Sequence, residues 1–68
     1  MQEYQRRVID EHFELEKKIH KLTEFIAGPV FCGLSSAEQR LLRRQQVLME
    51  LYAETITARI DGFNLEGD

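Results

Sequence analysis

The sequence predicts an all-α protein, an antiparallel helical hairpin with helices at about residues 2–27 and 36–63 that assembles into a homo-oligomer. Residues 2–27 contain no glycine or proline and are rich in good helix formers. Apolar residues recur at helical spacing on both sides of one short break. Because a short connection makes consecutive helices antiparallel neighbours, we expect one hairpin domain of residues 1–68, with a frayed tail at 64–68.

The first predicted helix carries an apolar seam whose steps alternate between four and three residues. This is the spacing of a coiled coil, and His12 occupies the one polar position of the series. A second strip on the same helix widens the apolar face beyond what one partner helix covers, so we expect that strip to be buried mainly between chains. The seam consists of Val8, Leu15, Ile19, Leu22 and Ile26, and the second strip of Ile9, Phe13 and Phe25.

The break and the start of the second helix have clear local signals. Gly28 favours a helix end and Pro29 cannot continue the helix that precedes it. Ser35 and Glu38 have the spacing of a capping box, which predicts the start of the second helix. The connector is apolar at Val30, Phe31 and Leu34, so we expect it to pack over the end of the hairpin. The second helix has apolar residues at Leu41, Leu42, Leu48, Met49, Tyr52, Ile56, Ile60 and Phe63.

A turn centred near Phe31 and Cys32 predicts the register of the two helices, with facing residue numbers that add to roughly 63. This register predicts a core of Leu15, Ile19, Leu48 and Tyr52. It also pairs Tyr4 with Arg59, Val8 with Ile56, His12 with Tyr52, Leu15 with Leu48 and Ile19 with Gln45. The polar seam positions His12, Gln45 and Arg59 are then best explained as residues that fix register or oligomeric state.

Size and cysteine content favour self-association. A domain of 68 residues has a thin core, and small domains compensate with disulfides, a metal or oligomerisation. Cys32 is the only cysteine, so an intrachain disulfide is excluded, and a lone thiol suits a reducing cytosol. Cys32 itself is expected to be an unreactive residue near the turn.

Charge and hydropathy exclude several classes of function. The net charge is −3 with acidic and basic residues interspersed, which argues against binding to long nucleic acids. Met1 is followed by polar residues, so we expect no signal peptide, and no apolar run reaches the ~20 residues that a membrane span needs.

The sequence lacks the motifs of an enzyme or a metalloprotein. It has no nucleophile motif, glycine-rich phosphate loop or Cys-x-x-Cys pair, so we expect no catalytic residues and no cofactor. His12, Glu16 and His20 share one helical face, but a single helix does not easily surround an ion, so we expect no metal site. Glu14 and Lys18 have the spacing of a surface ion pair.

Four residues could together hold a small anionic ligand, provided that more than one chain contributes. Lys21 and Thr23 lie near the predicted turn, whereas Tyr4 and Arg59 lie at the open end, roughly 25 Å away. Arginine and lysine bind phosphate, tyrosine stacks on a base and threonine donates a hydroxyl. An antiparallel or ring-like assembly would set the open end of one hairpin against the turn end of another.

A series of short motifs resembles a family of very short phage and prophage helical hairpins related to the phage anti-CBASS cyclic-nucleotide sponge. The motifs are Tyr4-x-x-Arg7-Val8, Lys21-Leu22-Thr23-x-Phe25-Ile26, Phe31-x-x-Leu34, Gln45-x-x-x-Met49-x-x-Tyr52 and Arg59-Ile60-x-x-Phe63. The resemblance covers residues 4–63 and implies a non-catalytic homo-hexamer in the cytoplasm of the bacterial host. It also implies a cyclic di- or trinucleotide ligand, such as cyclic GMP-AMP, which the protein sequesters from an immune effector.

The resemblance assigns the ligand site to particular residues. Lys21 and Thr23 match the lysine and threonine of the sponge pocket, and Tyr4 and Arg59 are the best matches for its aromatic residue and its arginine. Compared with the sponge, we expect the chain to lack an N-terminal extension. The alternative function is a protein–protein interaction module that binds a host protein through its exposed apolar helix face.

Overall fold

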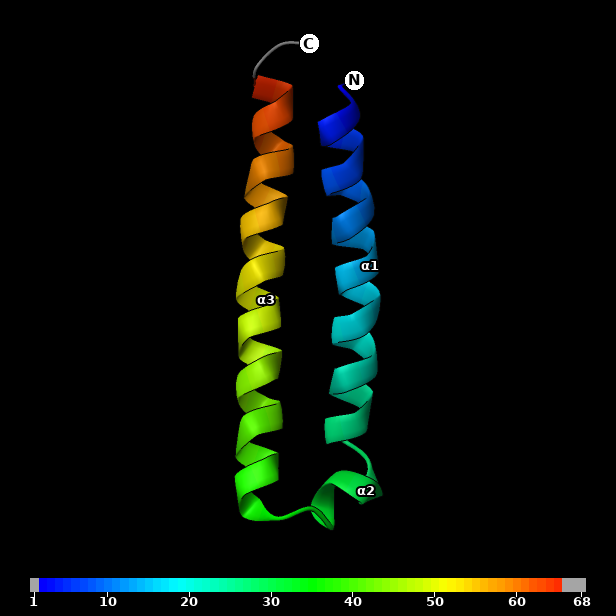
Figure 1. Ribbon diagram of the computed structural model, residues 1–68, viewed down its shortest axis with the longest axis vertical. Helices are drawn as coiled ribbons and strands as arrows, with labels where there is room; N and C mark the ends of the chain where they lie inside the picture. The colour runs from blue at the N-terminus through cyan, green and yellow to red at the C-terminus, as the bar shows by residue number, and fades with distance from the viewer. Residues whose placement is uncertain (1, 66–68) are drawn as a thin grey trace.

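The computed structural model describes residues 2–65, and all of its regular structure is helical (Figure 1). Helix α1 spans Glu3–Ile26, the short helix α2 spans Pro29–Cys32 and helix α3 spans Ser36–Leu65. Helices α1 and α3 run antiparallel and form a rod of 50 × 14 × 14 Å. The predicted all-α hairpin is therefore confirmed. Helix α3 extends to Leu65, two residues beyond the predicted end, and the remaining part of the predicted tail, 66–68, lies outside the described residues.

The predicted helix ends agree with the structure to within a few residues. Helix α1 ends at Ile26, one residue before the Gly28-Pro29 break, and Pro29 is the first residue of α2, where its missing N–H costs nothing. At the start of α3 the backbone N–H of Glu38 donates to Oγ of Ser35 at 3.1 Å. This bond is the serine half of the predicted capping box, and it satisfies one of the free N–H groups of the first turn.

The connector packs against the end of the hairpin, as its apolar sequence predicts. Phe31 is buried, its ring meets Phe25 edge-on at 6.5 Å, and the guanidinium of Arg43 lies 5.1 Å above it. The side-chain amide of Gln39 donates to the carbonyls of Phe31 at 2.9 Å and Leu34 at 3.2 Å. Gln39 thus satisfies carbonyl groups that a helix end and a turn leave free.

The core between α1 and α3 is small. Val8, Leu15, Ala53 and Ile56 are buried, and Ile19, Met49, Ile60 and Phe63 pack around them. The prediction is correct for Leu15, and Ile19 is partly buried, but it is wrong for Leu48 and Tyr52, which are 56% and 46% exposed. Met49 and Ala53 take the places that the sequence analysis gave to these two residues.

The register of α3 against α1 differs from the predicted register by somewhat more than a helical turn along much of the interface. His12 meets Thr57 and not Tyr52, and Tyr4 packs edge-on against Phe63 and not opposite Arg59. The reason is the connector: α2 adds a helical turn below the end of α1, and the first turn of α3 lies level with α2 (Figure 1). The numbers of residues that face each other across the hairpin therefore add to more than 63 at these positions. Val8 and Ile56 nevertheless both lie in the core, as predicted.

Large apolar side chains remain on the surface of the single chain. Phe13 is 62% exposed and Phe25 is 39% exposed, whereas Ile9 is partly buried. Their burial between chains stays a prediction. On α3 the exposed apolar residues are Leu41, Val47, Leu48, Leu51 and Tyr52.

Candidate ligand-binding residues and the groove on α3

The open end of the hairpin carries Tyr4 and Arg59. Tyr4 lies in the first turn of α1, where its ring meets Phe63 edge-on at 5.8 Å and 84°, and about half of the side chain is exposed. Arg59 lies near the end of α3 and is exposed. The contact with Phe63 orients the tyrosine ring while leaving it accessible to a ligand.

The turn end carries Lys21 and Thr23, both exposed on α1. The Oγ1 atom of Thr23 accepts a hydrogen bond from the side-chain amide of Gln46 at 3.0 Å. Gln46 was not predicted as a partner of Thr23, because the predicted register did not place the two residues opposite each other. Since Thr23 uses its oxygen as the acceptor, its hydroxyl proton stays available for a ligand.

The structure does not bring these four residues together within one chain. Tyr4 and Lys21 are separated along α1 by about 25 Å, at 1.5 Å per residue. The rod is 50 Å long and straight, so its two ends cannot close on one small ligand. A shared site therefore requires two chains, as the sequence analysis expected.

An open groove on α3 is a feature that the sequence analysis did not predict. It has a volume of about 370 Å³ and is lined by Leu41, Arg44, Gln45, Leu48, Met49 and Tyr52. The hydroxyl of Tyr52 donates to the carboxylate of Glu11, which fixes the ring at one end of the groove. We call Leu41, Gln45, Leu48 and Tyr52 the groove face. Arg59 follows Leu41 by five helical turns and so belongs to the same side of α3.

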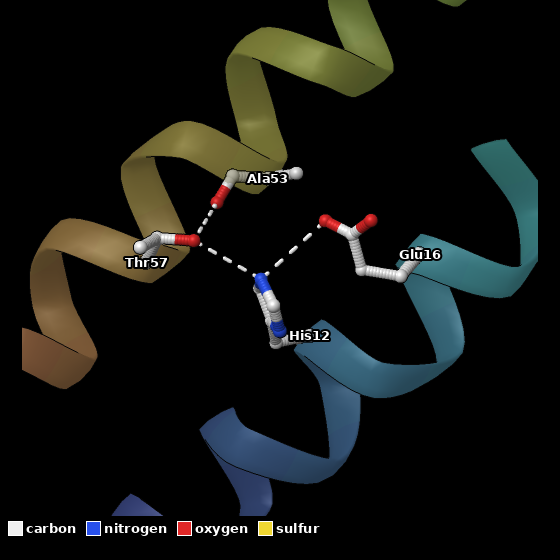
Figure 2. Close-up of polar contacts among 4 residues, drawn as sticks. All are labelled: His12, Glu16, Ala53 and Thr57. Carbon is white, nitrogen blue, oxygen red and sulfur yellow. Dashed lines mark hydrogen bonds and ion pairs between the residues drawn. The ribbon is translucent and has the colours of Figure 1, made fainter.

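A polar contact links the two helices on the other side of the core (Figure 2). Oγ1 of Thr57 lies 3.0 Å from Nε2 of His12 and donates its proton to the carbonyl of Ala53 at 2.9 Å. A hydroxyl has one proton, so Nε2 must supply the hydrogen of the contact with Thr57. The carboxylate of Glu16, at 3.5 Å, is a second acceptor for this N–H.

Other charged side chains of α1 form pairs on the surface of that helix. His20 lies 3.5 Å from Glu24, and no three His, Cys, Asp or Glu side chains among the described residues gather into a group that could hold a metal. Glu14 pairs with Lys17 at 3.4 Å and not with Lys18, because the ammonium of Lys17 also lies 4.6 Å above the ring of Phe13. Within residues 2–65, no helix is both long and apolar enough to cross a membrane.

The fold and these residues define a small helical-hairpin protein that presents binding surfaces. The chain belongs to the Sequestin family, whose model matches residues 2–62. It is also 40% identical over 60 residues to an uncharacterized 7.5 kDa protein from the denB-rIIB intergenic region of Enterobacteria phage T4, a match that covers 88% of this chain and 94% of that protein. No solved structure matches. These findings confirm the resemblance to small phage hairpins and support a sequestering function.

Proposed function

We propose that this protein sequesters cyclic oligonucleotide immune signals, cyclic di- or trinucleotides such as cyclic GMP-AMP, in the cytoplasm of a bacterial host, without any catalytic step. The observation that carries the proposal is the Sequestin match over residues 2–62, which includes all four candidate residues. The protein would lower the free concentration of the signal and so deprive an immune effector of its activator.

The chemistry of the four residues suits such a ligand. Arg59 and Lys21 are exposed cations that can neutralise phosphates, and arginine presents paired donors to phosphate oxygens. The accessible ring of Tyr4 can stack on a base. Thr23 retains a free hydroxyl proton for a phosphate oxygen, because Gln46 donates to its oxygen.

The separation of the two pairs makes the site depend on assembly. Tyr4 and Arg59 of one chain would face Lys21 and Thr23 of another, so that each ligand lies at a junction between subunits. We propose a homo-oligomer, a hexamer, as the functional form. A protein with this site would be assembled before ligand is added.

Exposed apolar side chains support the second candidate function, a module that binds a host protein. Phe13, Val47 and Leu51 are each more than half exposed on the single chain. An amphipathic helix of a host protein could bind such a surface. A module of this kind would bind its partner without any requirement for Arg59.

Isothermal titration calorimetry with cyclic di- and trinucleotides tests the sponge function. Loss of one charged hydrogen bond, about 1.5–3 kcal/mol, predicts that Arg59→Ala weakens binding about ten- to a hundred-fold while helix content is retained. The matched control is Arg40→Ala, an exposed arginine on the turn half of the same helix, which should bind as the native protein does. Absence of binding heat with the native protein would exclude the sponge function and favour the interaction module.

A further inference from the structure

We propose, building on the sequestering function proposed above, that Gln46 is a positioning residue of the ligand site. Its side-chain amide lies 3.0 Å from Oγ1 of Thr23 and joins α3 to α1 near the turn end of the hairpin. By donating to this oxygen, Gln46 holds the Thr23 hydroxyl so that its proton is directed to a phosphate oxygen of the ligand.

Thr23 differs from the other two threonines of the chain in the use of its hydroxyl proton. Threonines inside helices commonly donate to the carbonyl one turn back. Thr55 and Thr57 both donate in this way, at 3.0 and 2.9 Å. Among the hydrogen bonds of residues 2–65, Thr23 accepts from Gln46 and donates to no protein group. The proton of Thr23 is therefore left for a ligand.

The position of Gln46 on α3 explains why it reaches Thr23. Leu42 lies four residues before Gln46 and Met49 lies three residues after it, and all three side chains are half-buried. Gln46 therefore lies on the side of α3 that faces α1, at the edge of the apolar contact. A polar side chain at such a position costs stability unless it has a hydrogen-bonding partner, and Thr23 supplies the acceptor.

The direction of this bond matters because a hydroxyl has a single proton. With the amide N–H on its oxygen, Thr23 faces the ligand as a donor, which suits the acceptor oxygens of a phosphate. Without Gln46 the hydroxyl is free to rotate and to donate to the carbonyl of Ile19, one turn back, as Thr55 and Thr57 do to theirs. Loss of Gln46 should thus weaken binding without removing any group that touches the ligand.

A double-mutant cycle on the full-length chain separates this positioning role from a purely structural one. The variants are Gln46→Leu, Thr23→Val and the two combined, and calorimetric titration with cyclic GMP-AMP and cyclic tri-AMP gives their affinities. Circular dichroism and sedimentation of each variant confirm its helix content and its state of association. Thr55→Val is the matched control for loss of a helical threonine hydroxyl, because the Thr55 proton is already used within α3.

We expect Gln46→Leu to weaken binding about two- to ten-fold, and Thr23→Val about ten- to a hundred-fold because a hydrogen bond to a charged phosphate is lost. Thr55→Val should bind as the native protein does. In the Thr23→Val background, Gln46→Leu should change the affinity less than about two-fold, because the hydroxyl that it positions is gone. Unchanged affinity of Gln46→Leu, or the same factor of weakening with and without the Thr23 hydroxyl, would overturn the proposal.

A second variant of nearly the same size makes the test independent of the apolar substitution. The carboxylate introduced by Gln46→Glu accepts the Thr23 proton and donates nothing, so binding should be weaker than with Gln46→Leu. Gln45→Glu is the control for charge, because the amide of Gln45 contacts Met49 within α3 and not α1. Equal weakening by Gln46→Glu and Gln45→Glu would show an effect of charge alone and contradict the positioning role.

Failure of the proposed function and failure of this positioning role give different results. Absence of binding by the native protein would exclude the sponge function and, with it, any role of Gln46 toward the ligand. Binding that Arg59→Ala weakens but Gln46→Leu leaves unchanged would retain the sponge function and overturn only the role of Gln46.

Discussion

Nε2 of His12 on α1 lies 3.0 Å from the hydroxyl oxygen of Thr57 on α3, and the two residues are separated by 45 positions in the sequence. The contact joins the two long helices beside a core that has few members. Because the Thr57 proton goes to Ala53, His12 is the donor, and the bond fixes both the tautomer of the imidazole and the register of the hairpin.

Replacement of Thr57 by valine should therefore destabilise the hairpin. Loss of one net hydrogen bond predicts a decrease in the free energy of unfolding of about 0.5–1.5 kcal/mol, measured by urea denaturation at one protein concentration. Thr55→Val is the matched control, because Thr55 makes the same bond to a carbonyl one turn back, that of Leu51, at 3.0 Å and has no partner on α1. Equal effects of the two substitutions would contradict a role for the His12 contact.

Phe31 should be the most sensitive position of the connector. Its side chain is 3% exposed and packs between Phe25 and Arg43, so Phe31→Ala should lower the free energy of unfolding by about 3 kcal/mol. Val30 lies in the same short helix but is 63% exposed, and Val30→Ala should change stability by less than about 0.5 kcal/mol. Thermal denaturation followed by circular dichroism compares the two variants, and a similar melting temperature for both would be inconsistent with the packing of Phe31.

The helix cap at Ser35 provides a third stability test. Ser35→Ala removes the acceptor of the Glu38 N–H and should cost about 1 kcal/mol. Ser36→Ala, one residue further on and inside α3, should be neutral or slightly stabilising, because alanine is the better helix former. If chemical denaturation gives the opposite order, then Ser35 is not the residue that caps α3.

The helices and their ends could be predicted because they depend on local signals. Gly28-Pro29 and Ser35 act within a few residues of their own positions, and the structure confirms both boundaries. The pairing of the helices depends instead on the path of the connector. Nothing in the local pattern showed that Pro29–Cys32 would form a helical turn. Helix α3 packs against α1 through Met49, Ala53 and Ile56, so Tyr52 lies outside the core.

The candidate site was predictable only in part for the same reason. Tyr4, Lys21, Thr23 and Arg59 could be selected by residue type and by family resemblance, and the structure shows them as exposed or half-exposed. The bond from Gln46 to Thr23 and the groove between Leu41 and Tyr52 both depend on the register. The predicted register placed Thr23 away from Gln46 and turned Leu48 and Tyr52 toward α1, so neither feature could be predicted.

The short connection between α1 and α3 also has a consequence for how fast the protein forms. Only residues 27–35 separate the two long helices, so only a small loop must close before α1 and α3 can pack together. Most contacts are therefore local. Chains of this kind fold in microseconds to milliseconds. Assembly of separate hairpins requires collisions, so it should be the slow step, with a rate that rises with protein concentration.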